Sequence, residues 1–245
     1  MEIGIISGAS SGIGRAIAKE LDSLGFDELW LIGRNAEKLD ALKSELKCHS
    51  RLFILDLSDN ASFEALVSAL STGEYRIKCL VSSAGIGYTG TVESNTAKQI
   101  SNMIDVNCRG LTLLINTALP FMCDGGKIVN IASGAGFLPQ PDFAVYAATK
   151  SYVIRLSQAL RKELKSKKIN VCAACPGPVD TEFFANLENL KEYKRKYLIC
   201  PERVAKGVIK AVNKNKAIYC PTLSMKLLRL GTKLLPTSLL LKFAK

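Results

Sequence analysis

The stretch Ser7-Gly8-Ala9-Ser10-Ser11-Gly12-Ile13-Gly14 joins a short apolar segment, Ile3–Ser7, to a segment with helical spacing of its apolar residues. The first segment has the β-branched residues of a buried strand, and in the second apolar side chains recur every three or four positions until Gly25. Glycine permits a tight turn and lets a phosphate group approach the backbone. The following helix start offers free N–H groups and a positive dipole end. This context predicts a phosphate-binding turn, and a tight turn without a ligand is the weaker alternative.

Strand and helix signals alternate along the rest of the chain, and several strands are apolar on both faces, as parallel strands covered by helices are. The expected strands are Ile3–Ser7, Glu28–Gly33, Arg51–Asp56, Lys78–Ser82, Lys127–Ser133, Asn170–Pro176 and Ala217–Cys220, and the expected helices are Gly12–Leu24, Ala36–Leu46, Ser62–Leu70, Thr96–Leu119, Tyr146–Ser166 and Pro201–Asn213. This order predicts a doubly wound parallel α/β sheet of Rossmann type, with about seven strands and helices on both faces. No repeat or linker interrupts it, so residues 1–245 are expected to form a single domain.

Composition excludes several classes of protein. Hydrophobic residues make up 48% and charged residues 22% of the chain, which excludes a disordered protein. No apolar run reaches membrane-spanning length, and we expect neither a signal peptide nor a transmembrane helix. The net charge of +11 is typical of some nucleic-acid-binding proteins, but the basic residues are spread over several helices and the C-terminal tail. We therefore expect no nucleic-acid partner, although part of this charge could attract phosphate-bearing ligands or lipid headgroups.

Cysteine and histidine usage argues against metal and disulfide chemistry. The eight cysteines are scattered, as reduced thiols in a cytoplasmic protein would be. Cys172 and Cys175 lie within one expected strand, where residues three apart point to opposite faces, so a shared metal or redox disulfide is disfavoured. His49 is the only histidine. We expect no metal site and no mechanism based on a histidine.

Tyr146 and Lys150 form a Y-x-x-x-K pair one helical turn apart, on one face of an expected helix. A tyrosine alone has a pKa of about 10 and is a poor base at neutral pH. A nearby ammonium lowers that pKa, so the phenol could exchange a proton with a carbonyl or an alcohol. Such pairs also arise by chance on helix surfaces. Ser133 ends an expected buried strand thirteen residues earlier, and Asn107 stands mid-helix, where asparagine is otherwise unfavourable.

The G-x-x-x-G-x-G turn and the Y-x-x-x-K pair together resemble the short-chain dehydrogenase/reductase family, in its single-domain branch, over about residues 1–220. The resemblance implies an NAD(P)-binding Rossmann domain that moves hydride between a nicotinamide and a carbonyl or alcohol substrate. It implies four catalytic residues. Ser133 would hold the substrate oxygen and Tyr146 would exchange the proton. Lys150 would support the tyrosine and bind the nicotinamide ribose, and Asn107 would kink its helix and hold a water in the proton path.

The same resemblance implies a cofactor site. Its residues are Gly8, Ser10, Ser11, Gly12, Ile13, Gly14, Arg34, Asp56, Leu57, Ala84, Gly85, Tyr146, Lys150, Pro176, Gly177, Val179 and Thr181. Arg34 follows the second strand, where an acidic residue would favour NAD(H), and a guanidinium can pair with a 2′-phosphate. We therefore favour NADP(H), with NAD(H) as the alternative. Asp56 matches the position that contacts the adenine amine, and Thr181 and the Val179 backbone match those that contact the carboxamide.

Two positions depart from the family pattern. Ser7 stands where threonine is usual, which keeps the hydroxyl. Ser82-Ser83-Ala84-Gly85 stands where the family usually has Asn-Asn-Ala-Gly. The missing amides would otherwise brace the central sheet. This change weakens the expectation of tight cofactor binding but not the expected fold.

Two later segments suggest additional roles. Residues 180–200 are expected to cover the site, and within them Asp180–Leu198 is expected to form a charged helix that carries Phe183 and Phe184. With Phe137, Leu138 and Phe143 they favour an apolar or aromatic carbonyl substrate. Residues 222–245 are expected to form a basic amphipathic helix broken at Pro236. The helix could pack on its own body, contact another subunit or lie peripherally on a membrane.

Other functions stay open from sequence alone. The chain could be a non-catalytic cofactor-binding regulator or scaffold, or a membrane-surface lipid carbonyl reductase. A sugar epimerase is disfavoured because its glycine spacing differs. The resemblance implies a homodimer or homotetramer. Neither the substrate nor the physiological direction of the reaction follows from the sequence.

Overall fold

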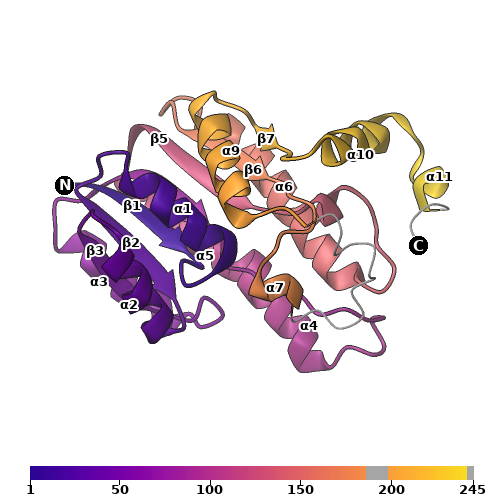
Figure 1. Ribbon diagram of the computed structural model, residues 1–245, viewed down its shortest axis with the longest axis horizontal. Coiled ribbons are helices and arrows are strands. Elements are labelled where there is room, and N and C mark those ends of the chain that lie inside the picture. Colours follow the sequence, from indigo (N-terminus) through magenta and orange to yellow (C-terminus); the bar gives the residue numbers. More distant parts are fainter. Residues whose placement is uncertain (186–197, 242–245) are drawn as a thin grey trace.

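Seven parallel strands form the centre of the computed structural model, which describes residues 1–185 and 198–241 (Figure 1). The strands are β1 (Glu2–Ser7), β2 (Glu28–Gly33), β3 (Ser50–Ile54), β4 (Arg76–Ser82), β5 (Met122–Ile131), β6 (Asn170–Ala174) and β7 (Ile218–Tyr219). Their order in the sheet is β3-β2-β1-β4-β5-β6-β7, and every pair is parallel. The predicted doubly wound fold is confirmed. The order reverses between β1 and β4, which is where sheets of this kind bind ligands.

Helices cover both faces of the sheet because successive strand residues point in opposite directions. One face carries α1 (Gly12–Asp22), α2 (Ala36–Glu45) and α9 (Pro201–Asn213), which pack on side chains such as Ile6. The other carries α3 (Ala61–Ser71), α5 (Leu111–Ala118) and α6 (Ala144–Glu163), which pack on side chains such as Ile5. Cys172 and Cys175 fall in different cores, as predicted, and all eight cysteines are free.

The helix predicted over Thr96–Leu119 is not continuous. It consists of α4 (Ala97–Ile104), a π-helical turn η1 (Asp105–Gly110) and α5, and a 3-10 turn, η2 (Leu119–Phe121), follows. Gly110 explains part of the irregularity, because a Cβ at this position would lie 2.4 Å from the Leu57 carbonyl oxygen. The helix therefore packs unusually close to the loop after β3. Helical spacing alone does not indicate such a turn, because a single π-helical turn requires no particular residue type.

The chain after β6 contains the predicted cover and the C-terminal tail. The structure describes α7 (Glu182–Ala185) within the helix predicted over 180–198, while residues 186–197 lie outside the described part of the chain. Ile199 then forms a parallel bridge with Val179. The tail contains α10 (Leu223–Leu234) and α11 (Thr237–Leu241), which are separated at Pro236 as predicted. Among the described helices, none has the length and apolar character needed to cross a bilayer.

The Ser82 departure leaves a gap in the hydrogen bonding of the sheet. Ser82 on β4 is in register with Asn130 on β5, and both residues are buried. The Asn130 amide donates to Ser157 Oγ at 2.9 Å, but Asn130 Oδ1 and Ser82 Oγ find no partner among the described residues. A serine is too short to reach across to the neighbouring strand. The loss of hydrogen bonding across the central sheet that the sequence predicted is therefore observed at Ser82.

The turn after β1 depends on one very close backbone approach. A Cβ added at Gly14 would lie 2.2 Å from the Gly8 carbonyl oxygen, which belongs to the backbone and cannot swing away. We expect Gly14→Ala to lower the free energy of unfolding by about 2–3 kcal/mol, measured by urea denaturation. Gly231→Ala in α10 is the matched control, because no atom lies within 4 Å of its added Cβ. This change should be neutral or stabilise by up to about 1 kcal/mol. Equal effects at the two positions would contradict the packing argument.

Candidate active site

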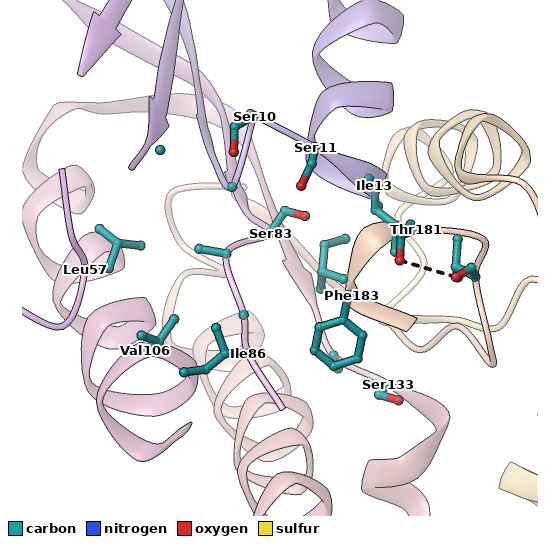
Figure 2. A pocket seen from close by; sticks show the side chains of 18 of the residues that line it. Ser10, Ser11, Ile13, Leu57, Ser83, Ile86, Val106, Ser133, Thr181 and Phe183 are labelled. Carbon is teal, nitrogen blue, oxygen red and sulfur yellow. Dashed lines mark hydrogen bonds between the residues drawn. The ribbon is translucent and has the colours of Figure 1, made fainter. Parts of the chain in front are cut away.

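A cavity lies at the carboxyl ends of the strands, across the point where the strand order reverses. It is lined by residues from every strand-to-helix turn in the centre of the sheet. The predicted residues that line it are Gly8, Ser10, Ser11, Gly12, Ile13, Arg34, Asp56, Leu57, Ala84, Gly85, Ser133, Tyr146, Lys150, Pro176, Gly177, Val179 and Thr181. Gly14 and Asn107 are the two predicted residues that do not line this central cavity. Figure 2 shows Ser10 and Ser11 at one end of the cavity and Ser133 at the other.

The glycine turn leaves backbone donors open toward the cavity. Gly8 and Gly12 have φ angles of +67° and +53°, in the left-handed region that favours glycine. Ser11 is the N-cap residue of α1, yet its side chain accepts no hydrogen bond from the helix. The first N–H groups of α1 therefore lack a side-chain acceptor and carry the positive end of the helix dipole. This end of the cavity is suited to an anion.

Arg34 and Asp56 form the outer edge of the same end. One Arg34 guanidinium nitrogen lies 3.7 Å from Asp56 Oδ2, and the arginine side chain is 66% exposed. Partial burial favours a raised pKa for Asp56. Hydrogen bonds from the Ser58 N–H and hydroxyl, with the charge of Arg34, outweigh this effect and lower the pKa overall. Asp56 is therefore ionised at neutral pH, and Arg34 keeps donors available for an incoming group.

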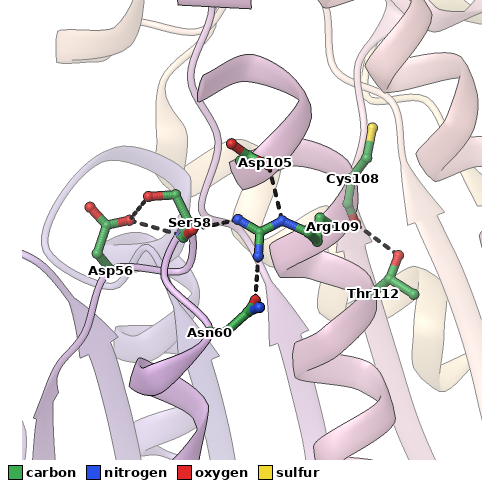
Figure 3. A network of polar contacts seen from close by, with 7 residues as sticks. All are labelled: Asp56, Ser58, Asn60, Asp105, Cys108, Arg109 and Thr112. Atoms are coloured by element: carbon green, nitrogen blue, oxygen red, sulfur yellow. Dashed lines mark hydrogen bonds and ion pairs between the residues drawn. The ribbon is translucent and has the colours of Figure 1, made fainter. Parts of the chain in front are cut away.

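Arg109 fixes the loop that carries Asp56. Its guanidinium donates to Asp105 Oδ1 at 2.9 Å, to the Ser58 carbonyl and to Asn60 Oδ1 (Figure 3). These bonds join the π-helical turn to the loop after β3. Sequence reasoning did not assign Arg109 any role, because its partners lie about fifty positions away along the chain.

Tyr146 lies at the opposite end and is almost enclosed. Its ring stacks on Phe143 at a centroid distance of 4.3 Å, and Phe183 packs 5.5 Å away on α7. Only 6% of the residue is exposed. Burial raises the pKa of Tyr146 well above its usual value, and interaction with the Ser133 hydroxyl opposes this only in part. The expectation that Lys150 lowers this pKa is therefore wrong for the structure as it stands, because desolvation between aromatic rings dominates.

Lys150 is a buried ammonium one turn beyond Tyr146. Its Nζ donates to the Ile131 carbonyl at 3.0 Å and lies 5.6 Å from the centre of the Tyr146 ring. It is 4% exposed, and burial lowers the pKa of Lys150 to about 8. A Cβ added at Gly85 would lie 3.2 Å from this nitrogen, so the glycine keeps the space beside Lys150 open. The lysine and the tyrosine share the cavity, as the Y-x-x-x-K spacing predicted.

Asn107 lies behind the cavity wall. Its Oδ1 accepts from the Ile86 N–H at 2.9 Å, and its Nδ2 donates to the Ile86 carbonyl at 2.8 Å and to Thr149 Oγ1 at 3.0 Å. The residue is fully buried, which excludes a solvated helix position. It holds the β4 loop against α6, at the π-helical turn where the resemblance implied a kink. Thr149 was missed from the sequence because its position beside Lys150 gives no signal of its partner.

The Tyr146 end is more aromatic than the lining of the rest of the cavity. Phe183, which Figure 2 shows, and Phe184 line it and contact each other at a centroid distance of 5.3 Å. Phe137 and Leu138 do not line it, and Phe137 instead packs against the core on the α6 side of the sheet. Phe143 reaches the cavity only through its stack on Tyr146. The prediction of five apolar lining residues is therefore correct for two.

Sequence reasoning missed several apolar lining residues. They are Ile32, Leu55, Ile86, Val106, Ile131 and Ala132. Each stands at a strand end or on a helix face where an apolar residue is expected for packing alone, so no sequence signal separates the two roles. In the part of the chain that the structure describes, no three His, Cys, Asp or Glu side chains are grouped so as to hold a metal ion.

The chain is similar to known proteins over most of its length. The family model for short chain dehydrogenase matches residues 2–192. A sulfoacetaldehyde reductase of Chromohalobacter salexigens is 37% identical, with 73% of this chain and 72% of that protein covered. A short-chain dehydrogenase from Sphingobium yanoikuyae, solved with NADPH, has a TM-score of 0.80 and 27% identity, covering 95% of each chain. A 3-ketoacyl-(acyl-carrier-protein) reductase from Brucella melitensis, solved with NADH, has a TM-score of 0.78 and 26% identity, covering 89% of this chain and 94% of that one. The chain belongs to the short-chain dehydrogenase family of oxidoreductases.

Proposed function

We propose that the protein is an NADP(H)-dependent oxidoreductase that interconverts a carbonyl compound and its alcohol, with Tyr146 as the acid and base. One observation carries the proposal. Ser133, Tyr146 and Lys150 share a cavity with the glycine turn and the N-terminus of α1. A phosphate site at one end and a proton donor at the other are what hydride transfer from a dinucleotide requires.

The residues present fit a nicotinamide dinucleotide. The uncapped start of α1 and the hydroxyls of Ser10 and Ser11 suit its pyrophosphate, and Asp56 suits the adenine amine. Lys150 lines the same cavity and would bind the nicotinamide ribose. When bound, the dinucleotide supplies or accepts the hydride. Two structurally similar proteins bind NADPH and NADH respectively, so the family likeness leaves the preference open.

Arg34 is the residue that favours NADP(H). It lies at the cavity edge with most of its side chain exposed, and its pairing with Asp56 is loose at 3.7 Å. A 2′-phosphate can accept two hydrogen bonds from such a guanidinium, whereas a ribose hydroxyl gains little from it. We infer that Arg34 contributes to binding chiefly through that phosphate.

In the reductive direction, the Tyr146 hydroxyl would donate its proton to the carbonyl oxygen while Ser133 donates a hydrogen bond to the same oxygen. The phenolate formed would need a cation nearby, and the ammonium of Lys150 is 5.6 Å from the ring. Asn107 would act as a positioning residue, because its three bonds fix the loop beside Lys150. The aromatic surface of Phe183 and Phe184 favours an apolar or aryl-bearing carbonyl compound.

The subunit arrangement stays a prediction. The resemblance implies contact through the helices before and after Ser133. Ile104 on α4 and Tyr152 on α6 are 46% and 41% exposed, as residues on such a surface would be. A homodimer or homotetramer remains our expectation for the protein in solution.

Tyr146→Phe tests the chemical step. It should lower the rate of NADPH oxidation with a panel of aryl and alkyl ketones by about a hundredfold to ten-thousandfold, because the proton donor is lost. NADPH binding, measured by cofactor fluorescence, should be unchanged. Tyr152→Phe on the same helix is the control and should keep full activity, since that phenol bonds only Thr112 among the described residues. If the protein's function in a cell-free assay were unaffected by Tyr146→Phe, it would instead be a cofactor-binding scaffold.

Arg34→Ala tests cofactor preference. It should weaken NADPH binding by about tenfold to a hundredfold, because charge-assisted hydrogen bonds to the 2′-phosphate are lost. NADH binding should not change. Lys43→Ala, an exposed residue of α2, is a control for the loss of one positive charge. Tighter binding of NADH than of NADPH by the unaltered protein would overturn the assignment.

Lys150→Met tests whether the buried ammonium of Lys150 lowers the free energy of unfolding. The folded-state pKa is lowered to about 8 from 10.5, so the folded protein is penalised while the lysine is charged. The penalty is complete below about pH 8 and disappears as the pH rises toward 10.5. We expect the variant to gain about 1–3 kcal/mol in free energy of unfolding at pH 7 and to lose that advantage at high pH. Lys165→Met, at an exposed position, should show no such pH dependence. A destabilised variant at pH 7 would show that Lys150 is structural.

A further inference from the structure

Helix α10 packs on the protein through one side only. Met225 is its innermost residue, and its sulfur would lie 2.4 Å from a Cβ added at Gly134 and 3.4 Å from one added at Gly177. Gly177 lines the central cavity, and Gly134 directly follows Ser133. Thr222 caps the helix by accepting from the Met225 N–H. The helix is thus attached beside the substrate end of the cavity, while α10 and α11 extend from the edge of the molecule beyond β7 (Figure 1).

The opposite side of α10 is an exposed row of leucines. Leu223, Leu227, Leu230 and Leu234 recur at intervals of four, three and four residues, so they form one stripe along the helix. They are 70%, 58%, 53% and 72% exposed. Met225 lies about 200° around the helix axis from Leu223, which places the stripe directly away from the protein body. These leucines therefore do not pack on their own domain, although the sequence left that alternative open.

Positive charge accompanies the stripe. Lys226 and Lys233 are exposed along one edge of it, and α10 has no acidic residue. Residues 203–245 contain ten Lys and Arg and no Asp or Glu, while residues 1–202 contain 23 basic and 22 acidic residues. Nearly all of the net charge of +11 thus resides in the last 43 residues. The charge is matched to an anionic surface and not to acidic groups of the same chain.

We propose that α10 docks the protein on anionic lipid membranes, with its leucine stripe in the acyl boundary and its lysines on the headgroups. An exposed apolar face bordered by lysines is the arrangement of helices that lie in the membrane interface. Two α10 helices packed antiparallel, stripe to stripe, would bring their lysine rows together without acidic partners, which disfavours that pairing of two copies as the occupant. Docking would place the lipid surface next to Gly134 and Gly177, and hence beside the substrate end of the cavity.

Co-sedimentation of the full chain with vesicles tests the proposal without any assay of activity. Vesicles of equal parts phosphatidylcholine and phosphatidylglycerol should pellet the protein, and phosphatidylcholine vesicles should not. Leu227→Ser with Leu230→Ser should weaken binding on the order of a hundredfold, because two partly inserted side chains are lost. Lys226→Gln with Lys233→Gln should weaken it about tenfold or more and reduce its dependence on salt.

Matched controls separate the helix from general properties of the chain. Ile54→Ser with Val67→Ser changes similarly exposed apolar residues on β3 and α3, and Lys43→Gln with Lys165→Gln removes the same charge elsewhere. Both controls should bind vesicles like the unaltered protein, and circular dichroism should show every variant folded. Equal binding to both kinds of vesicle, or equal loss in the controls and the α10 variants, would overturn the proposal. A leucine variant that changed oligomeric mass in sedimentation velocity while keeping vesicle binding would assign the stripe to a second copy instead.

Discussion

The contact between the turn after β1 and the end of β4 determines where the rest of the cavity lies. A Cβ at Gly8 would lie 2.7 Å from the Ala84 nitrogen, and Ser7 Oγ accepts from the Ser83 and Ala84 N–H groups at 3.2 and 3.3 Å. No side chain fits between these two segments. The start of α1 is therefore held at the reversal of strand order, with its free N–H groups facing the space that the other strand ends enclose. The hydroxyl that forms these bonds is the one feature that a serine in place of threonine preserves.

At the other end of the cavity lie two titratable side chains, Lys150 and Tyr146, whose charged forms are destabilised by burial. Lys150 and Tyr146 are nearly inaccessible, and burial lowers the pKa of the lysine and raises that of the tyrosine. Both shifts favour the neutral forms. The Lys150 ammonium therefore becomes stabilising only when negative charge develops on the phenol oxygen of Tyr146. A core formed for stability alone would have apolar residues at both positions. The presence of both groups here is the main physical support for the proposed proton transfer.

The sequence predicted the fold and most of the residues that line the cavity, because those features depend on local signals. Glycine spacing, strand ends and the Y-x-x-x-K pair each occupy a few consecutive positions and have a fixed place in a doubly wound sheet. The errors concern contacts between distant positions. Arg109 reaches Ser58 and Asn60, and the enclosure of Tyr146 depends on Phe183, 37 positions later. The direction of the tyrosine pKa shift was wrong for the same reason, since burial is a property of the assembled fold.

Access to Tyr146 depends on a weakly held element. Phe183 on α7 covers the tyrosine, and the neighbouring Glu182 pairs with Lys38 of α2 at 2.6 Å. The two side chains of that pair are 61% and 43% exposed, so it contributes little free energy, about 0–1 kcal/mol. An aromatic contact of this size adds roughly 0.5–1.5 kcal/mol. Moving Phe183 aside for a substrate therefore costs only a few kcal/mol, and an aryl group that stacked on Tyr146 in its place would recover part of that energy. This exchange supports the proposed preference for aromatic over small aliphatic carbonyl compounds.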